Sequence, residues 1–340
     1  MDLKTIAIIG AGPAGLEASG SLARLGHQVV LIEKSATVGG HLKDWYQLFP
    51  DRRPGKEILT QLVNGIKHPQ VQLKVNSQVS EMKKEQNDFA LTLTNQEVLN
   101  ADAVLVTTGF DMYDSTEKEE YGYGIYDNVI TNADLEQQLQ KGEIRTAIGK
   151  APKRVAIIHC VGSRDEKAGN NYCSKVCCVT AVKQAIQIKE RLPETEVFCF
   201  YMDIRMFGPY YEELYREAQE KWGVVFIRGK LSEAGQNRDG SLSIKAEDTL
   251  AGKPLRMDAD MLVLMAGMIP SEGSHKLASV LSIEQGQNRF FQPKDNHYQY
   301  NQSHNEGVFI AGTCVAPMNI TDTIASARAV ALKIDEYLKN

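Results

Sequence analysis

Four of the six cysteines in this chain lie within nineteen residues, at Cys160, Cys173, Cys177 and Cys178. Thiolates are the ligands of iron–sulfur clusters, and four of them suffice for one [4Fe–4S] cubane. Zinc also binds four thiolates, but structural zinc sites favour paired knuckles, whereas here one cysteine stands alone and two are adjacent. A redox-active thiol pair is the stronger alternative, because Cys173 and Cys177 share one face if their segment is helical. The spacing favours a cluster and leaves the thiol pair open.

Length and composition narrow the class of protein. A chain of 340 residues suits two domains, or one nucleotide-binding domain with a second inserted into it. The net charge of -5 is spread without long single-sign runs, which argues against nucleic-acid binding. No apolar stretch approaches the roughly 20 residues of a membrane span, and the first strand follows the N-terminus too closely for a signal peptide. We therefore expect a cytoplasmic protein with reduced thiols, not a disulfide framework.

A glycine-rich turn near the N-terminus separates a predicted strand at Thr5–Ile9 from a helix that extends to about Leu25. The turn reads Gly-Ala-Gly-Pro-Ala-Gly from Gly10, a second strand follows at residues 27–32, and Glu33 comes next. This is the strand–GxGxxG–helix–strand–acid order of dinucleotide-binding folds. The glycines permit a tight turn and a close approach of the backbone to a pyrophosphate, which the free N–H groups of the helix then face.

Later segments favour FAD over NAD at this first site. A second glycine pair follows the second strand, a buried strand ends in Thr-Thr-Gly at Gly109, and another ends in a glycine turn at Gly312. A helix then starts at about Ile320, with Asn319 or Thr321 as its cap. The expected cofactor-binding residues are Gly10, Gly12, Pro13, Ala14, Gly15, Glu33, Lys34, Gly40, His41, Leu42, Val79, Thr108, Gly109, Gly312, Thr313, Asn319 and Ile320.

Other residues near this site have simpler interpretations that stay open. Short strands at 71–75, 89–93 and 97–99 are expected to form a meander. His41 is either close to the flavin or in a structural hydrogen bond. Cys314 is expected to be a small packed residue more than a flavin contact, and Cys199, within an apolar strand, is expected in the core.

A second strand–turn unit begins at residues 154–159. A dinucleotide-binding reductase would place its nicotinamide nucleotide loop here, but no glycine-rich loop follows, and the turn instead begins with Cys160. A helix at about 174–191, a strand at 196–201, a helix at 210–222 and strands at 224–227 and 261–266 are expected next. The second nucleotide fold is therefore predicted to persist as a scaffold whose nicotinamide loop has been replaced by cluster ligands.

Together these signals predict an α/β protein with two Rossmann-like dinucleotide-binding domains, the second inserted into the first. We place the FAD-binding domain at residues 1–145 and 275–340, and the second domain, which carries the cysteine motif, at residues 150–272. The layout resembles the flavoproteins with two dinucleotide-binding domains, such as thioredoxin reductase. In that family the late glycine is followed by an aspartate that contacts the ribityl chain, and here Thr313 takes its place.

A more specific resemblance is to the A subunit of heterodisulfide reductase and its relatives. It is carried by the segments CVGSRD, YCSKVCC, AGTCVAP and MDIRMFGPYYEELYREAQEKWGVVFIRGK, and it extends over essentially the whole chain. Members contain FAD and an unusually coordinated [4Fe–4S] cluster. The resemblance therefore implies that the cluster ligands are Cys160, Cys173, Cys177 and Cys178.

The chain departs from methanogen members of that group. They carry further ferredoxin-like regions with additional cysteines, whereas only Cys199 and Cys314 remain here after four ligands are assigned. The chain is thus similar to the compact relatives: the A subunit of the sulfur-oxidising, lipoate-linked heterodisulfide-reductase-like complex, and the A subunit of the quinone-interacting oxidoreductase of sulfate reducers. Ala-Pro-Met-Asn at residues 316–319 replaces an expected Gly-Pro-Lys-Asp beside the flavin, so electron bifurcation is not carried over.

The resemblance implies an electron-transferring oxidoreductase subunit in which no side chain acts as nucleophile or general base. Expected partners are cysteine-rich B-type and ferredoxin-like C-type subunits, a lipoyl carrier protein that presents sulfane sulfur, and a second copy of the chain. NAD is an expected acceptor at the flavin. Two other interpretations stay open: a stand-alone NAD(P)H-dependent disulfide reductase that uses Cys173 and Cys177, and a non-catalytic scaffold that retains FAD structurally.

Overall fold

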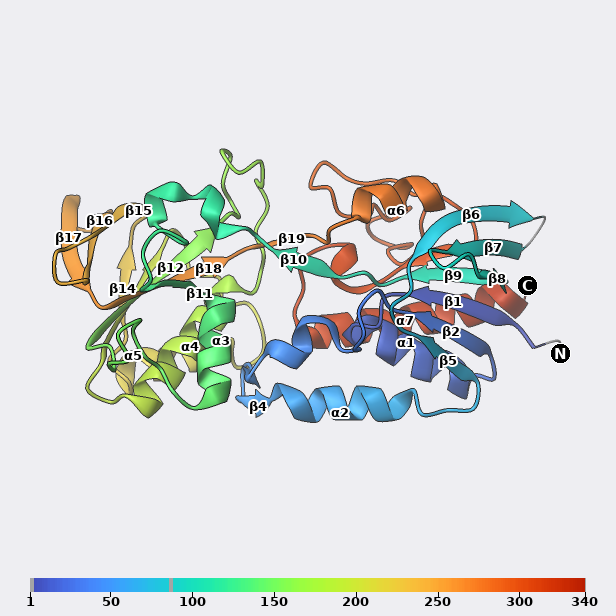
Figure 1. Cartoon of the computed structure of the whole chain (residues 1–340), viewed down its shortest axis with the longest axis horizontal. Helices are drawn as coiled ribbons and strands as arrows, with labels where there is room; N and C mark the ends of the chain where they lie inside the picture. Colours follow the sequence, from blue (N-terminus) through green and yellow to red (C-terminus); the bar gives the residue numbers. More distant parts are fainter. Residues whose placement is uncertain (1–2, 86–87, 340) are drawn as a thin grey trace. The chain divides into compact units, whose positions relative to one another are not determined.

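The computed structural model of this protein describes residues 3–85 and 88–339 (Figure 1). The chain divides into two units. Unit 1 contains Met1–Lys43, Lys56–Asp111 and Ile269–Asn340, and unit 2 contains Asp44–Gly55 and Met112–Met268. Residues 1–2, 86–87 and 340, which the expected first domain includes, lie outside the described residues.

Unit 1 is built on a parallel sheet of five strands in the order β20-β9-β1-β2-β5. The continuous apolar sequences of its central strands are buried on both faces, as parallel sheets require. Helices α1 and α7 pack side by side on one face, and the antiparallel meander β6-β7-β8 lies on the other (Figure 1). The bounds are β20 (Val308–Ile310), β9 (Ala103–Val106), β1 (Thr5–Ile9), β2 (Gln28–Ile32), β5 (Val71–Lys74), α1 (Pro13–Arg24), α7 (Ile320–Lys339), β6 (Val79–Glu85), β7 (Asp88–Leu93) and β8 (Val98–Ala101).

The meander differs from the expected one in its first strand. Residues 71–75 were expected to begin it, but β5 pairs in parallel with β2 at the edge of the main sheet. The first strand of the meander is β6, which the sequence did not indicate because its sequence, VSEMKKE, is mostly charged and largely exposed. Hydrophobic alternation cannot mark a strand that buries so few of its side chains.

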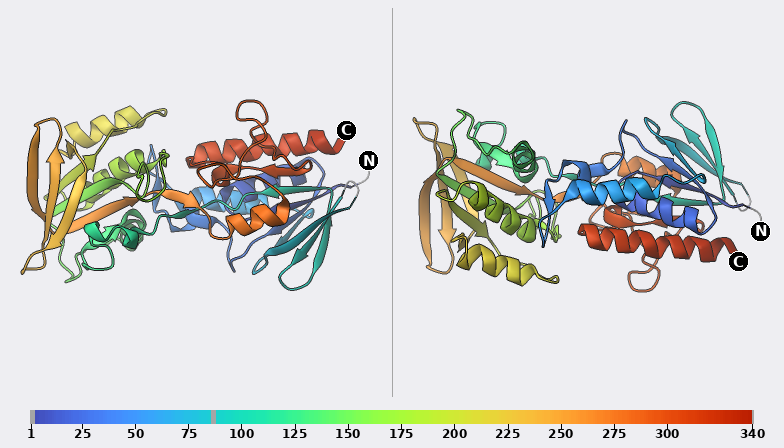
Figure 2. Two further views of the ribbon diagram at one scale, coloured as in Figure 1. Left: turned by 90° about the horizontal axis from the view of Figure 1, so that it is seen from above. Right: turned by 90° about the horizontal axis from the view of Figure 1, so that it is seen from below.

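Unit 2 repeats the architecture with a second parallel sheet of five strands, β11-β18-β12-β13-β14. Helices α3, α4 and α5 cover one face, and the antiparallel meander β15-β16-β17 lies on the side away from them (Figures 1 and 2). The bounds are β11 (Val129–Thr131), β18 (Met261–Ala266), β12 (Arg154–Val161), β13 (Glu196–Tyr201), β14 (Val225–Arg228), α3 (Asn132–Lys141), α4 (Cys177–Arg191), α5 (Tyr211–Glu220), β15 (Leu231–Gln236), β16 (Leu242–Asp248) and β17 (Lys253–Ala259).

Shorter elements connect these layers. Strands β10 and β19 pair with each other and lie at two of the four points at which the chain passes between the units. The remaining elements are η1 (Gly40–Asp44), β3 (Gln47–Leu48), β4 (Arg53–Pro54), α2 (Gly55–Gly65), β10 (Phe110–Met112), η2 (Ser115–Glu117), η3 (Glu119–Tyr121), β19 (Met268–Pro270), α6 (Ser274–Leu281) and η4 (Gly312–Cys314).

The border between the units lies earlier in the chain than the expected border at residues 145–150. Strand β11 pairs with β18 in the second sheet, and α3 contributes Leu135 and Leu139 to the core of unit 2. The start of α3 is fixed by a capping box in which Thr131 and Asp134 each accept a hydrogen bond from the other's backbone N–H. Residues 112–145 therefore complete the second nucleotide fold and do not extend the first.

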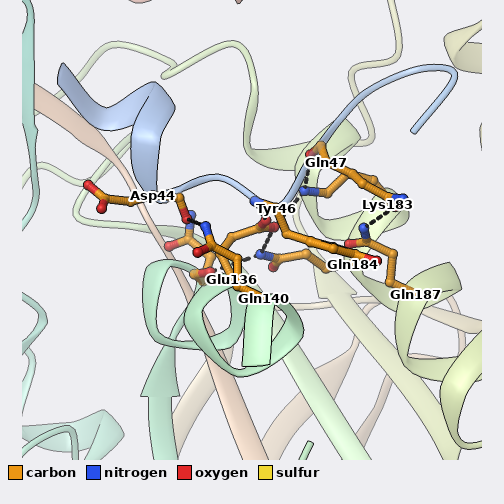
Figure 3. A network of polar contacts seen from close by, with 9 residues as sticks. Asp44, Tyr46, Gln47, Glu136, Gln140, Lys183, Gln184 and Gln187 are labelled. Atoms are coloured by element: carbon orange, nitrogen blue, oxygen red, sulfur yellow. Dashed lines mark hydrogen bonds and ion pairs between the residues drawn. The ribbon is translucent and has the colours of Figure 1, made fainter. Parts of the chain in front are cut away.

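A buried ion pair attaches the segment Asp44–Gly55 to the helices of unit 2 (Figure 3). Lys183 on α4 lies 2.5 Å from Glu136 on α3, and both side chains are 1% exposed. The Lys183 Nζ also donates to the carbonyl of Gln47 at 2.8 Å, and Glu136 accepts from the N–H of Tyr46 at 2.9 Å. Burial lowers the pKa of Lys183 although Glu136 opposes that effect.

We expect Lys183→Met to lower the free energy of unfolding by about 3–5 kcal/mol, because it leaves the Glu136 carboxylate buried without its cation. Urea denaturation of the whole chain measures the change. The matched control is Lys221→Met, which breaks the exposed pair of Lys221 with Glu217 and should cost no more than about 1 kcal/mol. An equal loss of unfolding free energy in the two variants would contradict a stabilising role for the buried pair of Lys183 and Glu136.

Candidate functional site

The glycine turn of unit 1 lies at the carboxyl edge of the first sheet, where the strand order changes direction between β1 and β9. A Cβ at Gly10, where φ is +105°, would lie 2.6 Å from the carbonyl oxygen of Thr107. A Cβ at Gly15 would collide with the carbonyl oxygen of Gly10. At Gly12 a Cβ would meet no described atom within 4 Å. Gly10 and Gly15 are therefore needed by the fold, whereas Gly12 leaves its face open to a ligand.

The N-terminus of α1 is suited to an anion. Pro13 occupies the first turn, no described side chain caps the helix at Gly12, and the first turn contains no acid. The free N–H groups of α1 and the positive end of its dipole are therefore directed at the glycine turn. Glu33, the expected ribose ligand, uses one carboxylate oxygen to accept from the N–H of Ala11 and the other to accept from the N–H of Ser35, each at 2.8 Å. A ribose contact by Glu33 stays a prediction.

Segments far apart in sequence meet at this turn. The position of a Cβ on Gly40 would be 3.3 Å from the Gly12 Cα, and that of a Cβ on Gly312 would be 2.8 Å from the Ala14 Cβ. The position of a Cβ on Gly109 would be 3.7 Å from the Thr313 hydroxyl oxygen. These six expected residues thus lie together at one edge of the sheet.

The remaining expected residues of unit 1 differ in their surroundings. Lys34 is exposed, Leu42 is buried, and Val79 starts β6 with its side chain in the core. Asn319 accepts from the N–H of Asp322 at 2.8 Å and so caps α7, of which Ile320 is the first residue. The role of these residues toward a cofactor stays a prediction.

Thr108 supplies an observation that points to a ligand. Its hydroxyl oxygen is buried, and it has no hydrogen-bond partner in the part of the chain that the structure describes. Buried hydroxyl groups are almost always hydrogen-bonded, so a polar atom of a bound molecule is the expected partner. With the open face of Gly12, this fits a dinucleotide cofactor at the edge of the sheet.

His41 and Cys314 have structural contacts. A ring nitrogen of His41 lies 2.9 Å from the carbonyl oxygen of Phe110, and the two rings lie 4.6 Å apart. The Cys314 thiol is buried in the core beneath the meander and donates to the carbonyl of Ala311 at 3.1 Å. Cys199 is also completely buried, as expected for a core residue.

The four clustered cysteines lie at the corresponding edge of unit 2. Cys160 is near the carboxyl end of β12, Cys173 is in the loop that follows, and Cys177 and Cys178 form the first turn of α4. In this sheet the strand order changes direction between β12 and β18, the place at which a second nucleotide would bind. The cysteines thus occupy the expected nicotinamide position.

The sulfurs are close enough to act on one another. Burial, together with smaller contributions from the thiols of Cys178 and Cys173, raises the pKa of Cys160 to about 12, although Arg164 opposes the rise. Burial also raises the pKa of Cys177, with contributions from the other three thiols. Burial raises the pKa of Cys178 in the same way, and Cys173 adds to that rise. All four cysteines are free thiols in the structure, so they form one cluster of sulfurs with no disulfide among them.

Four thiols could ligate a single metal ion or a metal cluster. Among the residues that the structure describes, no three His, Cys, Asp or Glu side chains are grouped closely enough to hold one metal ion. A single zinc needs all its sulfurs at about 2.3 Å from one centre. A [4Fe–4S] cubane presents a separate iron to each thiolate, and four cysteines match the number of ligands that it takes.

Hydrogen-bond donors surround the sulfurs. The N–H of Lys175 donates to the Cys173 sulfur at 3.3 Å, and the backbone N–H of Arg205 acts to lower the pKa of Cys178. Helix α4 has no side-chain cap at Val176 among the described residues and no acid in its first turn. Donors to sulfur and a positive helix end both stabilise an anionic iron–sulfur cluster.

The backbone of this site is strained. Cys160, Arg164 and Lys175 have φ values of 60°, 53° and 59°, in the left-handed region that residues other than glycine rarely adopt. Such conformations cost free energy and persist where the surroundings impose them, often at functional sites. Their concentration around the cysteines is consistent with a site built for a ligand.

The same geometry argues against a reactive thiol pair at Cys173 and Cys177. A nucleophilic cysteine requires a lowered pKa and access to solvent. Cys177 is buried, and burial raises its pKa well above the ordinary value. In the disulfide reductase interpretation, Cys177 would therefore be a poor attacking thiol.

One contact that holds the cysteine loop has no signal in the sequence. Lys118 lies 2.5 Å from Asp165, and both side chains are buried. Burial raises the pKa of Asp165, but hydrogen bonds from Lys118 and from the N–H of Ala168 outweigh it and leave that pKa lowered. The two residues are 47 positions apart, and neither lies in a periodic pattern that predicts the pairing.

Comparisons with known proteins show which proteins the chain resembles. Residues 3–141 match the family described as pyridine nucleotide-disulphide oxidoreductase. The A subunit of the H(2):CoB-CoM heterodisulfide,ferredoxin reductase of Methanothermobacter thermautotrophicus is 43% identical over 236 residues, which are 68% of this chain and 36% of that protein. The iron-sulfur A subunit of the CoB–CoM heterodisulfide reductase of Methanocaldococcus jannaschii is 33% identical over 96% of this chain and 63% of that protein. The chain thus spans from about a third to just under two thirds of the length of these relatives.

Solved structures give the same fold. The thioredoxin reductase of T. acidophilum has a TM-score of 0.68 and covers 99% of this chain and 100% of its own, at 17% sequence identity. That of Lactococcus lactis also has a TM-score of 0.68, at 16% identity, and covers 99% of both chains. At these identities the likeness establishes the two-domain nucleotide-binding fold alone. In the described part of the chain, no helix is long and apolar enough to span a membrane. The identities and the arrangement of the cysteines confirm the resemblance inferred from the motifs: the chain belongs to the family of heterodisulfide reductase A subunits.

Proposed function

We propose that this protein is an oxidoreductase subunit that holds FAD in unit 1 and a [4Fe–4S] cluster in unit 2, and that it transfers electrons within a heterodisulfide-reductase-like complex. When bound, FAD converts between two-electron and one-electron transfer, and the cluster carries single electrons. The observation that carries the proposal is the replacement of the second nucleotide loop by four mutually interacting cysteines, while the first loop keeps its glycines.

The residues of unit 1 would bind and orient the flavin cofactor. The turn at Gly12 and the free N–H groups of α1 would receive the diphosphate, and Glu33 would bind the adenosine ribose. The Thr108 hydroxyl would donate to a polar atom of the ligand. The further proposed contacts are Gly10, Pro13, Ala14, Gly15, Lys34, Gly40, His41, Leu42, Val79, Gly109, Gly312, Thr313, Asn319 and Ile320.

The residues of unit 2 would ligate the cluster and shield it from water. Cys160, Cys173, Cys177 and Cys178 would each bind one iron as a thiolate. Burial of Cys177 and Cys178 keeps the inner side of the site dry, whereas Cys160 and Cys173 are partly exposed. The exposed side would face the proteins with which the cluster exchanges electrons.

Partners and substrate follow from relatives that are named as subunits of heterodisulfide reductases. We infer that this chain assembles with cysteine-rich B-type and ferredoxin-like C-type subunits and with a second copy of itself in the cytoplasm. By its resemblance to the sulfur-oxidising relative, we propose that the complex acts on sulfane sulfur on a lipoyl carrier, with NAD as acceptor. The quinone-interacting relative is the alternative. Reduction of the bound flavin by NADH would favour the sulfur-oxidising relative.

We expect Gly12→Ala to weaken FAD binding by at least about tenfold, equivalent to about 1.4 kcal/mol, without destabilising the protein free of FAD. The added Cβ meets no described atom of the protein, but it would intrude where the diphosphate approaches the turn. The control is Gly65→Ala at the end of α2, whose Cβ is equally unobstructed among the described residues. Flavin titration and urea denaturation measure the two effects. Unchanged FAD affinity in Gly12→Ala would contradict a diphosphate at this turn.

We expect Cys177→Ser, purified anaerobically, to lose its iron and keep its FAD, since it removes one ligand of a site remote in sequence from the glycine turn. The wild-type chain should contain about four irons per FAD. Cys314→Ala is the control, because Cys314 lies in the core of unit 1 and should not affect iron content. The iron, sulfide and flavin contents of each variant are measured. A wild-type chain that stays free of iron after anaerobic reconstitution would overturn the proposed cluster, and a cluster that never changes oxidation state would support a scaffold instead.

A further inference from the structure

Arg164 lies in the loop between the first two cysteines, and its guanidinium is held from one side. One terminal nitrogen, Nη2, donates to a carboxylate oxygen of Asp203 at 2.7 Å. The other, Nη1, is buried and has no hydrogen-bond partner among the described residues. The backbone of Arg164 is left-handed, with φ of 53°, and its N–H donates to the carbonyl of Tyr172 at 2.9 Å. The loop thus fixes both the backbone and one edge of the guanidinium.

The cysteine sulfurs are the groups that this cation faces. The charge of Arg164 acts on Cys160 and Cys173, and it opposes the rise that burial causes in the pKa of Cys160 and of Cys178. Asp203 connects the same parts by its backbone, because its carbonyl accepts from the Cys178 thiol at 3.6 Å. One residue therefore anchors both the arginine and a cluster ligand.

A structural role alone does not account for the buried nitrogen. If Arg164 served only to pair with Asp203, both of its terminal nitrogens would be expected to find acceptors or solvent, since buried donors are rarely left unbonded. The Cys160 sulfur is a neighbouring acceptor, because a hydrogen bond from Arg164 acts to lower the pKa of that thiol, and a sulfur becomes a strong acceptor only when it is ionised on iron. An arginine that donates to such a sulfur makes a charge-assisted hydrogen bond.

We propose that Arg164 is a positioning residue for the cluster: its guanidinium, held by Asp203, donates a hydrogen bond to a cluster sulfur and raises the reduction potential of the cluster. The inference rests on the proposed function, since it needs the cluster to be present. Reduction adds one negative charge to the cluster, and a fixed cation stabilises the reduced form more than the oxidised form. Hydrogen bonds to the sulfurs are among the features that set such potentials.

The surroundings supply a matched control. Arg228 lies 3.6 Å from the other carboxylate oxygen of Asp203, and it is not among the main groups that shift the pKa of Cys160, Cys177 or Cys178. Arg228→Gln removes the same charge and the same kind of partner from Asp203 without removing the donor that faces the sulfurs. Arg205, which also acts on Cys178, is exposed and is left unchanged in every variant.

The experiment compares the wild-type chain with Arg164→Gln, Arg164→Lys and Arg228→Gln, each purified anaerobically with its cofactors. Iron and flavin contents are measured first, and then the midpoint potential of the cluster by titration monitored with electron paramagnetic resonance. We expect Arg164→Gln to keep its iron and shift to a lower potential. Arg164→Lys, which keeps the charge but loses the fork of donors, should lie between it and the wild type. Arg228→Gln should match the wild type.

An unchanged potential in an iron-replete Arg164→Gln would overturn the inference, as would an equal shift in Arg228→Gln. If Arg164→Gln loses iron, Arg164→Lys decides: a retained cluster with a lowered potential supports the inference, and a retained cluster with the wild-type potential overturns it. Loss of iron from both Arg164 variants would show a folding role and also overturn it. A wild-type chain without iron would refute the proposed function itself, and the two failures are therefore distinguishable.

Discussion

Crowding of four sulfurs at a buried sheet edge is the constraint on which the second unit depends. In the absence of positive charge, burial and mutual repulsion keep these thiols from ionising, as the raised pKa values of Cys160, Cys177 and Cys178 show. Ligation requires all four as thiolates, so iron must supply the compensating charge. Further positive potential comes from the uncapped start of α4, the N–H groups directed at sulfur and the Arg164 guanidinium. Each of these groups favours negative charge on the sulfurs.

The nucleotide fold provides this site with little rebuilding. Its parallel strands still end together at the switch point, and the helix that would have faced a phosphate instead begins with two cysteines. What changes is the turn after β12. There Cys160 is left-handed, and Gly162 (φ +69°) lies so close to the ring of Tyr113 that a Cβ would collide with it. A glycine is needed at this point to let the loop double back over the strand and bring Cys173 to the other cysteines.

Local patterns in the sequence predicted most of the strands and helices and the identity of the clustered residues, because those signals are carried by neighbours in the chain. Glycine spacing marked the first turn, and apolar runs marked β1, β9, β12 and β18. Long-range pairings could not be predicted in this way. Lys183 has the sequence context of an ordinary helix lysine, yet it is buried against Glu136. The place of Asp44–Gly55 in unit 2 and the addition of β11 to the second sheet likewise depend on contacts with residues far along the chain.

The chemistry of the described residues limits what this chain does by itself. General acid–base catalysis needs a group that exchanges protons near neutral pH. His159, the histidine next to the cysteine motif, is buried, and burial lowers its pKa to about 4, so its ring is neutral at pH 7. The buried thiols have raised pKa values and are poor nucleophiles. Buried sulfurs with raised pKa values and one partly exposed side suit the electron transfer proposed for this site. Under the proposed function, bond chemistry on a disulfide or sulfane substrate would then belong to the partner subunits.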